Sequence, residues 1–545
     1  MKTGRRIVIV GGVAGGASAA ARARRVDESA EIVIYERGPY ISFANCGLPY
    51  FIGGEIKERS QLLLMSPEKM WSRSRVRVHV GHEVLSIDRA AKTVRVRRPD
   101  GEEEDAAYDK LILSQGAKPI VPPIPGANGD NVFTLRDVPD MDRIGAFLDS
   151  RKAKTAAVIG GGFIGLEMAE AFHRRGMKVT IVEKLPHILP LLDDDMAAYL
   201  QNHLAGNDID IRVGAEAKRF SAAGVELADG AFVAAELILL SVGVRAEVEM
   251  ARAAGLEMGL TGGVKTNASM ESSDADIYAV GDAAETTNAV TGAATRIPLA
   301  GPANRQGRIA GANAAGGHFV YPGALGTSIV RMMQMTAAST GLNSAQAGKA
   351  GFDFFSSVTR DPQHAGYFPG ATPLMIKTIV ESGTGRLLGA QVVGEEGVDK
   401  RIDVFSTAIA GRMTVFDLES LDLAYAPPFG SANDPVNTAG FVADHIVRGD
   451  LATLSPEEWK PSGEFLVDVR ENLEVAESGV LGGAHPIPLG ELRDRLGELP
   501  REGKIMVYCQ KGQRGYLAAC ILKGNGFTDV TNLRGGFQAA KLYGL

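Results

Sequence analysis

Cysteine is scarce in this chain, which has three, Cys46, Cys509 and Cys520, among 545 residues. So few thiols exclude a disulfide framework and suit a reducing cytosol, so we expect a cytoplasmic protein. Long apolar runs are also missing: no stretch reaches the roughly 18 apolar residues of a membrane span. The apolar run at positions 7–10 is too short for a secretory signal, and we interpret it as a first strand.

An excess of basic residues is absent as well, because the net charge is −7. That balance argues against a general nucleic-acid binder, which needs a basic face. With 45% hydrophobic and 23% charged residues, the composition is that of a globular protein without disordered tracts. The length predicts three or four domains, each with its own core.

Glycine is abundant, with 66 residues, and two segments use it in one pattern. Each has an apolar strand, a glycine turn, an alanine-rich helix and a second strand ending in an acid. The first runs IVIVGGVAGGASAAARARR and then EIVIYERG; the second runs AAVIGGGFIGLEMAEAFHRRG and then KVTIVEK. Such βαβ units place a pyrophosphate at a helix N-terminus, and two copies predict two Rossmann-like dinucleotide-binding domains.

The second copy matches GxGxxG in full, and Glu183 ends its next strand. That acid should bind a ribose 2′-hydroxyl and favour NADH, although neighbouring Lys184 leaves NADPH open. In the first copy, Val13 occupies the middle glycine position and Glu36 is the acid. A third element, DIYAVGDAAE, places Asp282 after a short strand, either as a flavin contact or as an ordinary turn.

The segment SFANCGLPY carries Cys46 without a neighbouring partner, because the next cysteine is Cys509. Flavin enzymes that reduce disulfides usually carry two cysteines a few residues apart. If Cys46 does redox chemistry, its second sulfur must come from elsewhere. This absence indicates a low-molecular-weight thiol as substrate or co-substrate.

These features together resemble a known family. The double nucleotide fold, SFANCGLPYFIGG, YAVGD and AYAPPFG are similar to the single-cysteine pyridine nucleotide-disulfide oxidoreductases, and among these most to the coenzyme A disulfide reductases. The tail resembles a rhodanese domain, with FLVDVR, GGAHPIPL, VYCQKGQRG and NLRGGF.

The resemblance implies an α/β fold with two Rossmann-like domains, an α+β dimerisation domain and a C-terminal rhodanese α/β domain. We expect an FAD-binding domain at 1–115 and 245–325 and an NAD(P)H-binding domain at 116–244. A dimerisation domain should follow at 326–445, a linker at 446–462 and the rhodanese domain at 463–545.

The expected cofactors are FAD, NADH or NADPH, and coenzyme A. The expected FAD contacts are Gly11, Val13, Ala14, Gly15, Glu36, Arg37 and Asp282. The expected NAD(P)H contacts are Gly160, Gly162, Gly165, Glu183 and Gly243.

Coenzyme A is highly anionic and needs a basic cradle. On the first predicted helix Ser18, Arg22 and Arg25 are spaced i, i+4 and i+7 and share one face. Arg73 and Arg75 add positive charge, and the resemblance adds Ser42, Asn45 and Asn304. Ser74 and Asn433 replace the basic residues expected there, so the phosphate contacts stay open.

The catalytic residues implied are Cys46, Cys509, Tyr367 and Tyr425. A helix start beside a flavin should lower the pKa of Cys46 and make it a nucleophile. Tyr367 and Tyr425 match tyrosines that reach the active site from a partner subunit, which implies a homodimer. The alternative is that both are interface aromatics.

The loop Cys509, Gln510, Lys511, Gly512, Gln513 and Arg514 lies between a strand and a helix. Its backbone N–H groups should form an anion nest around the sulfur, with added charge from Lys511 and Arg514. We expect Cys520 to pack in the core and His485 to be structural. No His/Cys cluster has metal-ligand spacing.

The leading hypothesis is an FAD-dependent NAD(P)H oxidoreductase that acts on coenzyme A disulfide, coenzyme A persulfide or polysulfide through Cys46. In this hypothesis Cys509 of the rhodanese domain handles sulfane sulfur. One alternative is an NADH oxidase or peroxidase that cycles a sulfenic acid on Cys46. Such peroxidases carry a histidine at the first glycine-loop helix, where this chain has VAGGASAA. The other alternative is a redox sensor or sulfur carrier.

Overall fold

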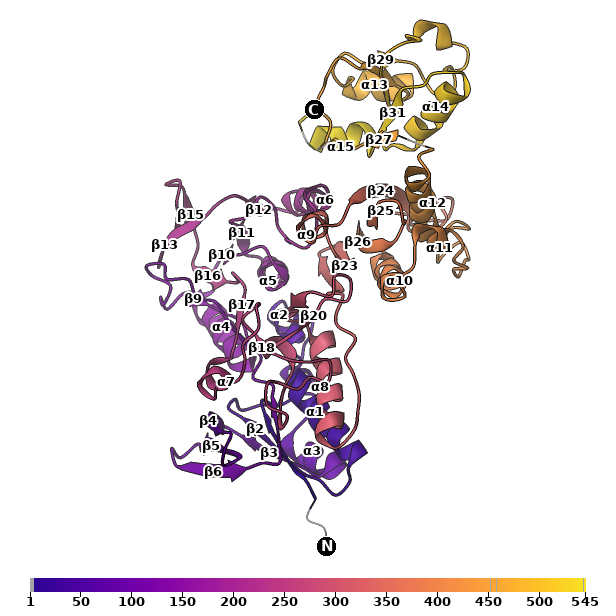
Figure 1. The fold of residues 1–545 in the computed structure, drawn as a ribbon. Helices are drawn as coiled ribbons and strands as arrows, with labels where there is room; N and C mark the ends of the chain where they lie inside the picture. The colour runs from indigo at the N-terminus through magenta and orange to yellow at the C-terminus, as the bar shows by residue number, and fades with distance from the viewer. Residues whose placement is uncertain (1–3, 451, 457, 543) are drawn as a thin grey trace. The chain divides into compact units, whose positions relative to one another are not determined.

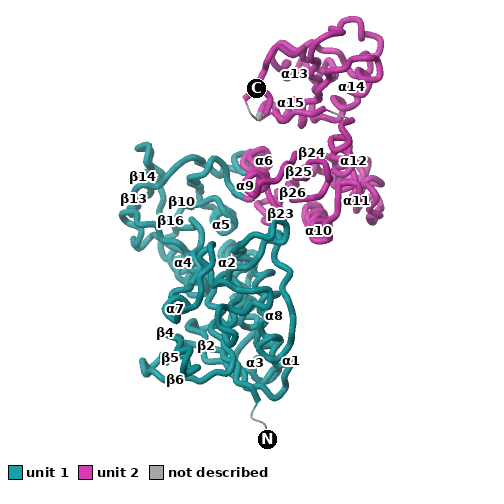
Figure 2. The backbone as a smooth tube through the Cα atoms, viewed as in Figure 1, with its two compact units in different colours: residues 1–190, 204–328 teal, residues 191–203, 329–545 magenta. Residues whose placement is uncertain are grey.

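The computed structural model describes residues 4–450, 452–456, 458–542 and 544–545. The chain forms two compact units (Figure 2), one of residues 1–190 and 204–328 and the other of residues 191–203 and 329–545. Among the residues described, no helix is both long and apolar enough to cross a membrane.

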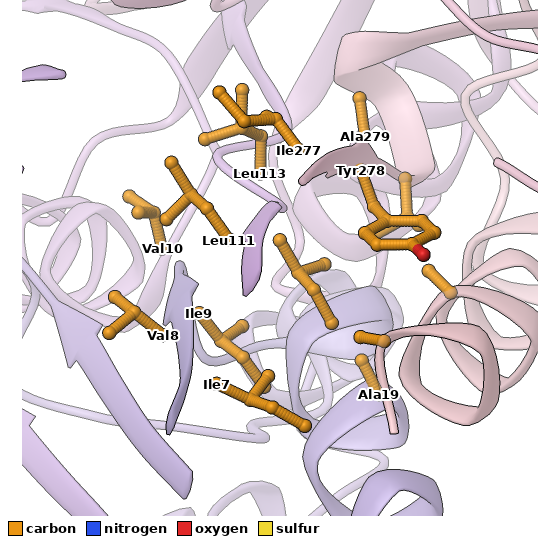
Figure 3. Close-up of a cluster of buried hydrophobic side chains, with 14 of the residues drawn as sticks. Ile7, Val8, Ile9, Val10, Ala19, Leu111, Leu113, Ile277, Tyr278 and Ala279 are labelled. Atoms are coloured by element: carbon orange, nitrogen blue, oxygen red, sulfur yellow. The ribbon is translucent and has the colours of Figure 1, made fainter. Parts of the chain in front are cut away.

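The first sheet of the N-terminal unit is parallel and has the order β19-β7-β1-β2-β3. Its strands are β1 (Arg6–Val10), β2 (Glu31–Glu36), β3 (Val76–Val80), β7 (Lys110–Leu113) and β19 (Ile277–Ala279). The strands β1, β2, β7 and β19 are largely apolar because both faces of a parallel sheet are covered, whereas the edge strand β3 alternates apolar and polar residues. Figure 3 shows side chains of β1, β7 and β19 in the resulting core beside Ala19.

Two helices, α1 (Ala14–Val26) and α8 (Ala300–Ala314), pack side by side (Figure 1). Small residues make this close packing possible. A Cβ added to Gly307 would lie 2.1 Å from the carbonyl oxygen of Gly15, and one added to Gly311 would lie 2.2 Å from that of Ala19. The contact brings residues almost 300 positions apart onto adjoining faces.

The second sheet is also parallel, with the order β12-β11-β10-β16-β9. Its strands are β9 (Val132–Phe133), β10 (Thr155–Ile159), β11 (Lys178–Val182), β12 (Ile209–Arg212) and β16 (Leu237–Leu240), and α5 (Phe163–Arg174) follows β10. The chain passes between the two sheets at β8 (Ala117–Pro119) and β17 (Val244–Ala246), which pair with each other. The predicted α/β fold with two Rossmann-like sheets is confirmed.

Smaller elements complete this unit. The strands are β4 (Glu83–Asp88), β5 (Thr93–Arg97), β6 (Glu103–Ala107), β13 (Ala217–Ser221), β14 (Gly224–Leu227), β15 (Phe232–Ala234), β18 (Val264–Lys265), β20 (Ala284–Thr287) and β21 (Ala294–Thr295). The helices are α2 (Leu48–Ile52), α3 (Pro67–Ser74), α4 (Val138–Arg151) and α7 (Glu249–Ala253), with 3₁₀ turns η1 (Asn45–Gly47), η2 (Arg59–Leu62) and η3 (Gly281–Ala283).

The second unit contains a sheet of order β22-β23-β26-β25-β24. The pairs β23–β26, β26–β25 and β25–β24 are antiparallel. Its strands are β22 (Ser328–Met332), β23 (Met335–Gly341), β24 (Phe354–Pro362), β25 (Pro373–Glu381) and β26 (Leu387–Gly394). The accompanying helices are α6 (Asp194–Ala205), α9 (Ser344–Lys349), α10 (Val398–Ala410), α11 (Val415–Glu419) and α12 (Pro435–Val447).

The last sheet is parallel, with the order β27-β31-β30-β28-β29. Its strands are β27 (Ala452–Leu454), β28 (Phe465–Asp468), β29 (His485–Pro486), β30 (Ile505–Tyr508) and β31 (Val530–Leu533). The helical elements are α13 (Asn472–Ser478), α14 (Gln513–Gly524), α15 (Gly536–Leu542) and η4 (Leu496–Glu498). β27 lies inside the stretch expected as a linker and pairs with β31, a contact that its polar surroundings in sequence conceal.

Two glycines provide a matched test of this packing. A Cβ added to Gly165 on α5 would lie 2.0 Å from the carbonyl oxygen of Gly160, whereas one added to Gly145 on α4 would contact nothing within 4 Å. We expect Gly165→Ala to destabilise the protein by about 1–3 kcal/mol through overpacking. Gly145→Ala should stabilise it by about 0.5–1 kcal/mol because the helical backbone loses less entropy. Thermal unfolding of both variants measures the difference, and equal melting temperatures would contradict this account.

Candidate active site

The two glycine turns have matching geometry. Gly11 and Gly160 adopt left-handed φ angles of 92° and 107°. The third glycines, Gly16 and Gly165, bring the helix backbone so close that an added Cβ would lie 1.8 Å and 2.0 Å from the carbonyl oxygens of Gly11 and Gly160. These contacts aim the first turns of α1 and α5 at the carboxyl ends of their strands.

Both helix starts fit a pyrophosphate. Neither α1 nor α5 has a side-chain cap or an acidic residue in its first turn, so their N–H groups remain available to an anion. A Cβ on Gly162 would meet nothing within 4 Å, which leaves the space that a phosphate needs. Val13 takes the equivalent place before α1, followed by Ala14 and Gly15 in its first turn. The residues present therefore fit FAD at α1 and NAD(P)H at α5.

The two predicted ribose acids are held in the same way by the backbone. Glu36 accepts hydrogen bonds from the N–H groups of Gly12 (2.8 Å) and Gly38 (2.7 Å). Glu183 accepts from Gly161 (2.7 Å) and Leu185 (2.7 Å). Each carboxylate is thereby fixed beside its glycine turn.

The basic residues that follow the two acids in sequence form ion pairs with other carboxylates. Lys184 pairs with Glu216 at 2.7 Å, and Arg37 forms a two-point ion pair with Glu247. Gly243, predicted to contact NAD(P)H, adopts a left-handed φ of 103° beside β17.

Cys46 lies in η1, immediately before α2, and is an exposed residue. The side-chain oxygen of Asn45 accepts hydrogen bonds from the backbone N–H of Cys46 (3.0 Å) and from its thiol (3.6 Å). Pro49 stands in the first turn of α2, as the predicted sharp entry into a helix requires. Asn45, expected as a coenzyme A contact, therefore also orients the candidate nucleophile.

The surroundings of Cys46 raise its pKa, first through burial and then through the negative charges of Glu167 and Asp282. Desolvation and the two carboxylates outweigh the backbone hydrogen bond at the helix start, so the lowered pKa expected beside a flavin stays a prediction that depends on the cofactor. Asp282 lies in η3 directly after β19, and burial raises its own pKa. Cys46 and Asp282 therefore lie near each other, although the sequence separates them widely.

Glu167 is a site residue that sequence reasoning missed. It projects from α5, two residues after Gly165, and accepts a hydrogen bond from the hydroxyl of Tyr50 on α2 at 3.1 Å. Burial raises the pKa of Glu167 to about 7, with a further contribution from Glu170. An acid in the first turns of the second glycine-loop helix, among apolar residues, was the available signal.

Most of the predicted coenzyme A residues lie on or next to α1, α3 and α8, of which α1 adjoins the other two, whereas Ser42 and Asn45 lie in the Cys46 segment. The hydroxyl of Ser18 on α1 donates to the side-chain oxygen of Asn304 on α8 at 2.9 Å. The Arg22 guanidinium lies 5.3 Å from the centre of the Phe319 ring. Arg24 joins α1 to the end of α3 through the carbonyl oxygens of Ser74 (2.9 Å) and Arg75 (3.1 Å).

The contact between α1 and the end of α3 places the other predicted arginines at neighbouring helix ends. Arg25, Arg73 and Arg75 are exposed at the ends of α1 and α3, so their charges face solvent. Ser42 adopts a left-handed φ of 45° just before the Cys46 turn, and its N–H donates to the carbonyl oxygen of Gly12. Ser42 thus ties the Cys46 segment to the first glycine turn.

Tyr367 and Tyr425 meet in the second unit, where their hydroxyl groups lie 3.2 Å apart. Both rings are exposed, to 77% and 49%, as is the nearby Phe429 at 70%.

The Cys509 loop joins β30 to α14 as predicted. The thiol of Cys509 is buried and accepts a hydrogen bond from the N–H of Gly512 at 3.1 Å. Arg514 makes a two-point ion pair with Glu474, at 2.6 and 2.7 Å, so its charge is largely neutralised. Lys511 and Gln513 are exposed, and Gln510 contacts Arg470.

A buried ion pair supports this loop. Asp468 and Arg470 are both 0% exposed and lie 2.6 Å apart. The Arg470 guanidinium also stacks 3.8 Å from the ring centre of Phe537, whose N–H donates to the carbonyl oxygen of Cys509. Removing either charge would leave its partner buried and unpaired, at a cost of about 3–5 kcal/mol.

Two further expectations concern this module. The prediction that Cys520 packs in the core is wrong, because it is exposed while the neighbouring Ala518, Ala519 and Leu522 fill the buried face of α14. His485 is partly exposed and contacts Glu498 at 2.7 Å. No group of three or more His, Cys, Asp or Glu residues in the described parts of the chain could hold a metal ion.

Family comparisons agree with this architecture. Residues 5–307 match the pyridine nucleotide-disulphide oxidoreductase model, residues 327–434 match the dimerisation domain of that family and residues 451–542 match a rhodanese-like domain. The chain belongs to the pyridine nucleotide-disulphide oxidoreductase family and carries a C-terminal rhodanese-like domain.

Individual proteins and solved structures are similar to this chain over most of its length. A coenzyme A disulfide reductase of Staphylococcus haemolyticus is 35% identical over 446 residues, which cover 81% of this chain and 99% of that protein. The structure of reduced Bacillus anthracis CoADR-RHD is 45% identical, with a TM-score of 0.96 over 99% of this chain and 98% of that one. A NAD-dependent persulfide reductase from A. fulgidus is 37% identical, with a TM-score of 0.92 over 97% and 99% of the two chains.

The raised pKa of Glu167 has a consequence for stability. Folding favours the protonated form of a carboxyl whose pKa is raised from 4.5 to about 7. The wild type therefore loses stability as pH rises from about 4.5 to 7, by up to roughly 3 kcal/mol. Glu167→Gln lacks this loss and should melt at a higher temperature than the wild type at pH 8, but not at pH 4.5.

The matched control is Glu58→Gln, which replaces an exposed glutamate on the same unit and should follow the wild type at both pH values. A second readout is the pH profile of Cys46 alkylation. It should shift to lower pH in Glu167→Gln because one negative charge near the thiol is gone. Melting temperatures that differ equally at both pH values would argue against a titrating Glu167.

Proposed function

We propose that this protein is an FAD-dependent NAD(P)H oxidoreductase that reduces coenzyme A disulfide, coenzyme A persulfide or polysulfide through Cys46. The observation that carries the proposal is Cys46, an exposed residue whose thiol is oriented by Asn45 and which has no second cysteine in its segment. The printed names of the relatives, coenzyme A disulfide reductase and persulfide reductase, support the same substrate class.

The residues of the FAD and NAD(P)H sites have distinct tasks in this proposal. FAD, when bound, supplies two-electron redox chemistry. The α1 turn with Glu36 and Asp282 would hold it, while the α5 turn with Gly162 and Glu183 would hold the nicotinamide nucleotide. We infer the matching domain limits, 1–115 with 245–325 and 116–244, from the same two turns.

Cys46 would act as the nucleophile. Its thiolate attacks one sulfur of coenzyme A disulfide, the S–S bond breaks, and the released coenzyme A thiolate takes the electron pair. Ser18, Arg22, Arg25, Asn304, Arg73 and Arg75 would hold the nucleotide part of coenzyme A. The opposite charges of this region and the ligand favour the encounter.

Cys509 would carry sulfane sulfur. A persulfide on Cys509 is anionic, and the Gly512 N–H that points at its sulfur stabilises such a charge. A rhodanese-like module fused to the reductase favours persulfide or polysulfide over plain disulfide as the physiological substrate.

The protein would work as a homodimer. The match to a dimerisation domain supports this assembly, as does the exposed aromatic surface around Tyr367 and Tyr425. A tyrosine hydroxyl from the partner subunit could then hydrogen-bond the leaving thiolate.

The test compares NADH oxidation with coenzyme A disulfide, coenzyme A persulfide, polysulfide and peroxide. Cys46→Ser should abolish every sulfur-dependent activity, since the nucleophile is lost. Cys509→Ser should lower activity on polysulfide by at least about tenfold and leave coenzyme A disulfide reduction near the wild-type rate. Cys520→Ser serves as the matched control, because Cys520 is an exposed cysteine of α14 to which the proposal gives no role.

Peroxide as the best acceptor would instead favour a sulfenic acid cycle on Cys46. Slow turnover with every acceptor, together with tight binding to another protein, would favour a redox sensor or sulfur carrier.

A further inference from the structure

The two exposed tyrosines of the second unit lie on separate loops. Tyr367 belongs to the loop 363–372, which joins β24 to β25, and Tyr425 belongs to the loop 420–434, which joins α11 to α12. Both rings are exposed, so burial of the rings does not fix their positions. Their hydroxyl groups nevertheless lie 3.2 Å apart. Contacts elsewhere in the two loops must therefore set this distance.

The first loop is closed at its base by the side chain of Gln363. Its Oε1 accepts a hydrogen bond from the N–H of Thr372 at 2.6 Å, and its Nε2 donates to the carbonyl oxygen of Gly370 at 3.1 Å. Gln363 itself is buried. Because one buried amide holds both ends of the loop, Tyr367 is carried on a closed turn.

Arg401 of α10 fastens the base of this turn to the second loop. Its guanidinium donates to the carbonyl oxygen of Gln363 at 2.6 Å and to both carboxylate oxygens of Asp434, at 2.8 and 3.2 Å. Asp434 ends the loop that carries Tyr425 and caps α12, where it accepts a hydrogen bond from the N–H of Val436 at 3.1 Å. One planar guanidinium therefore joins the two tyrosine-bearing loops.

The ion pair at this junction is buried. The side chains of Arg401 and Asp434 are 2% and 3% exposed, and the Lys400 ammonium lies 3.1 Å from the same carboxylate. Burial alone would raise the pKa of Asp434, but the hydrogen bonds from Arg401 hold it below its ordinary value. Apolar residues of similar volume often stabilise a protein as well as a buried ion pair does. What this pair adds is direction, because a two-point contact fixes both partners in one plane.

A backbone hydrogen bond extends the connection towards the tyrosines. The N–H of Ala365 in the first loop donates to the carbonyl oxygen of Gly430 in the second at 2.9 Å. Ala365 is buried, and its own carbonyl oxygen accepts from the N–H of Phe368 at 2.9 Å. The turn that presents Tyr367 is therefore anchored on both sides of the ring. All these contacts lie within the second unit.

We propose that Arg401 is a positioning residue that holds Tyr367 and Tyr425 together as one hydrogen-bonded pair. The proposal rests on the function above, in which this pair serves the active site of the partner subunit. A hydroxyl that accepts a hydrogen bond from a second hydroxyl is a stronger donor to a leaving thiolate, because hydrogen bonds in a chain polarise one another. The reaction then requires the spacing of the two hydroxyls, and Arg401 sets that spacing.

The first test is a double-mutant cycle on the FAD-loaded full-length protein, with coenzyme A disulfide as the substrate. Arg401→Lys keeps a positive charge beside Asp434 but replaces the planar fork by a single ammonium. We expect kcat and kcat/KM to fall together by about tenfold, since the pair acts on the leaving group. In the Tyr367→Phe background, the same change should have no further effect beyond about twofold, because the pair is already absent.

Lys377→Arg is the matched control. It makes the reverse exchange at another buried cation of the same sheet, one that pairs with Asp193 and Asp195. A general loss of stability in this sheet would affect both variants. We expect the kcat of Lys377→Arg to stay within about twofold of the wild type, because its ion pairs do not involve the tyrosine-bearing loops.

A second measurement does not depend on turnover. The hydrogen bond with Tyr425 raises the pKa of Tyr367. Ultraviolet titration of each protein is compared with that of the same protein carrying Tyr367→Phe, which isolates this ionisation. It should occur at lower pH in Arg401→Lys and in Gln363→Ala than in the wild type. Gln363→Ala opens the base of the loop without disturbing a buried charge, so it replaces Arg401→Lys if that variant does not fold.

Equal losses of kcat from Arg401→Lys with and without Tyr367 would overturn the proposal, because Arg401 would then act by another route. A loss in Lys377→Arg as large as that in Arg401→Lys would overturn it too, as would an unchanged tyrosine titration in Gln363→Ala. If the wild type does not reduce coenzyme A disulfide while the titration still shifts, the proposed reductase function falls and the positioning role of Arg401 stands.

Discussion

The close approach of helix to strand at the two glycine turns is the constraint on which the candidate site depends. Gly16 and Gly165 bring α1 and α5 within contact of the carbonyl oxygens of Gly11 and Gly160, where no side chain would fit. The approach also fixes where every later residue of each helix points. Ser18 and Arg22 on α1 and Glu167 on α5 owe their positions to it.

The sequence predicted the turns and loops whose conformation depends on a few consecutive residues. Both glycine turns, the acids that close them, the turn at Cys46 and the loop at Cys509 lie where the sequence placed them, because each is set by a few consecutive residues. The domain families followed from the same motifs.

Features that depend on distant contacts could not be predicted in this way. Glu167 is an ordinary helix residue until α2 brings Tyr50 against it, and Arg401 is an ordinary helix residue until Gln363 and Asp434 lie beside it. The error at Cys520 has another origin: the apolar run YLAACILK hides that only part of a helix faces the core. A pattern of residue types does not contain the packing that decides burial.

The two candidate sulfur sites differ in how they treat charge. At Cys46, burial and two carboxylates raise the pKa of the thiol. At Cys509, Arg514 is neutralised by Glu474, and the backbone N–H of Gly512 is left to face the sulfur. A fixed, buried dipole is screened by dissolved ions far less than a mobile surface cation is. A sulfur atom carried on Cys509 would therefore keep its electrostatic stabilisation at high ionic strength as well as in dilute buffer.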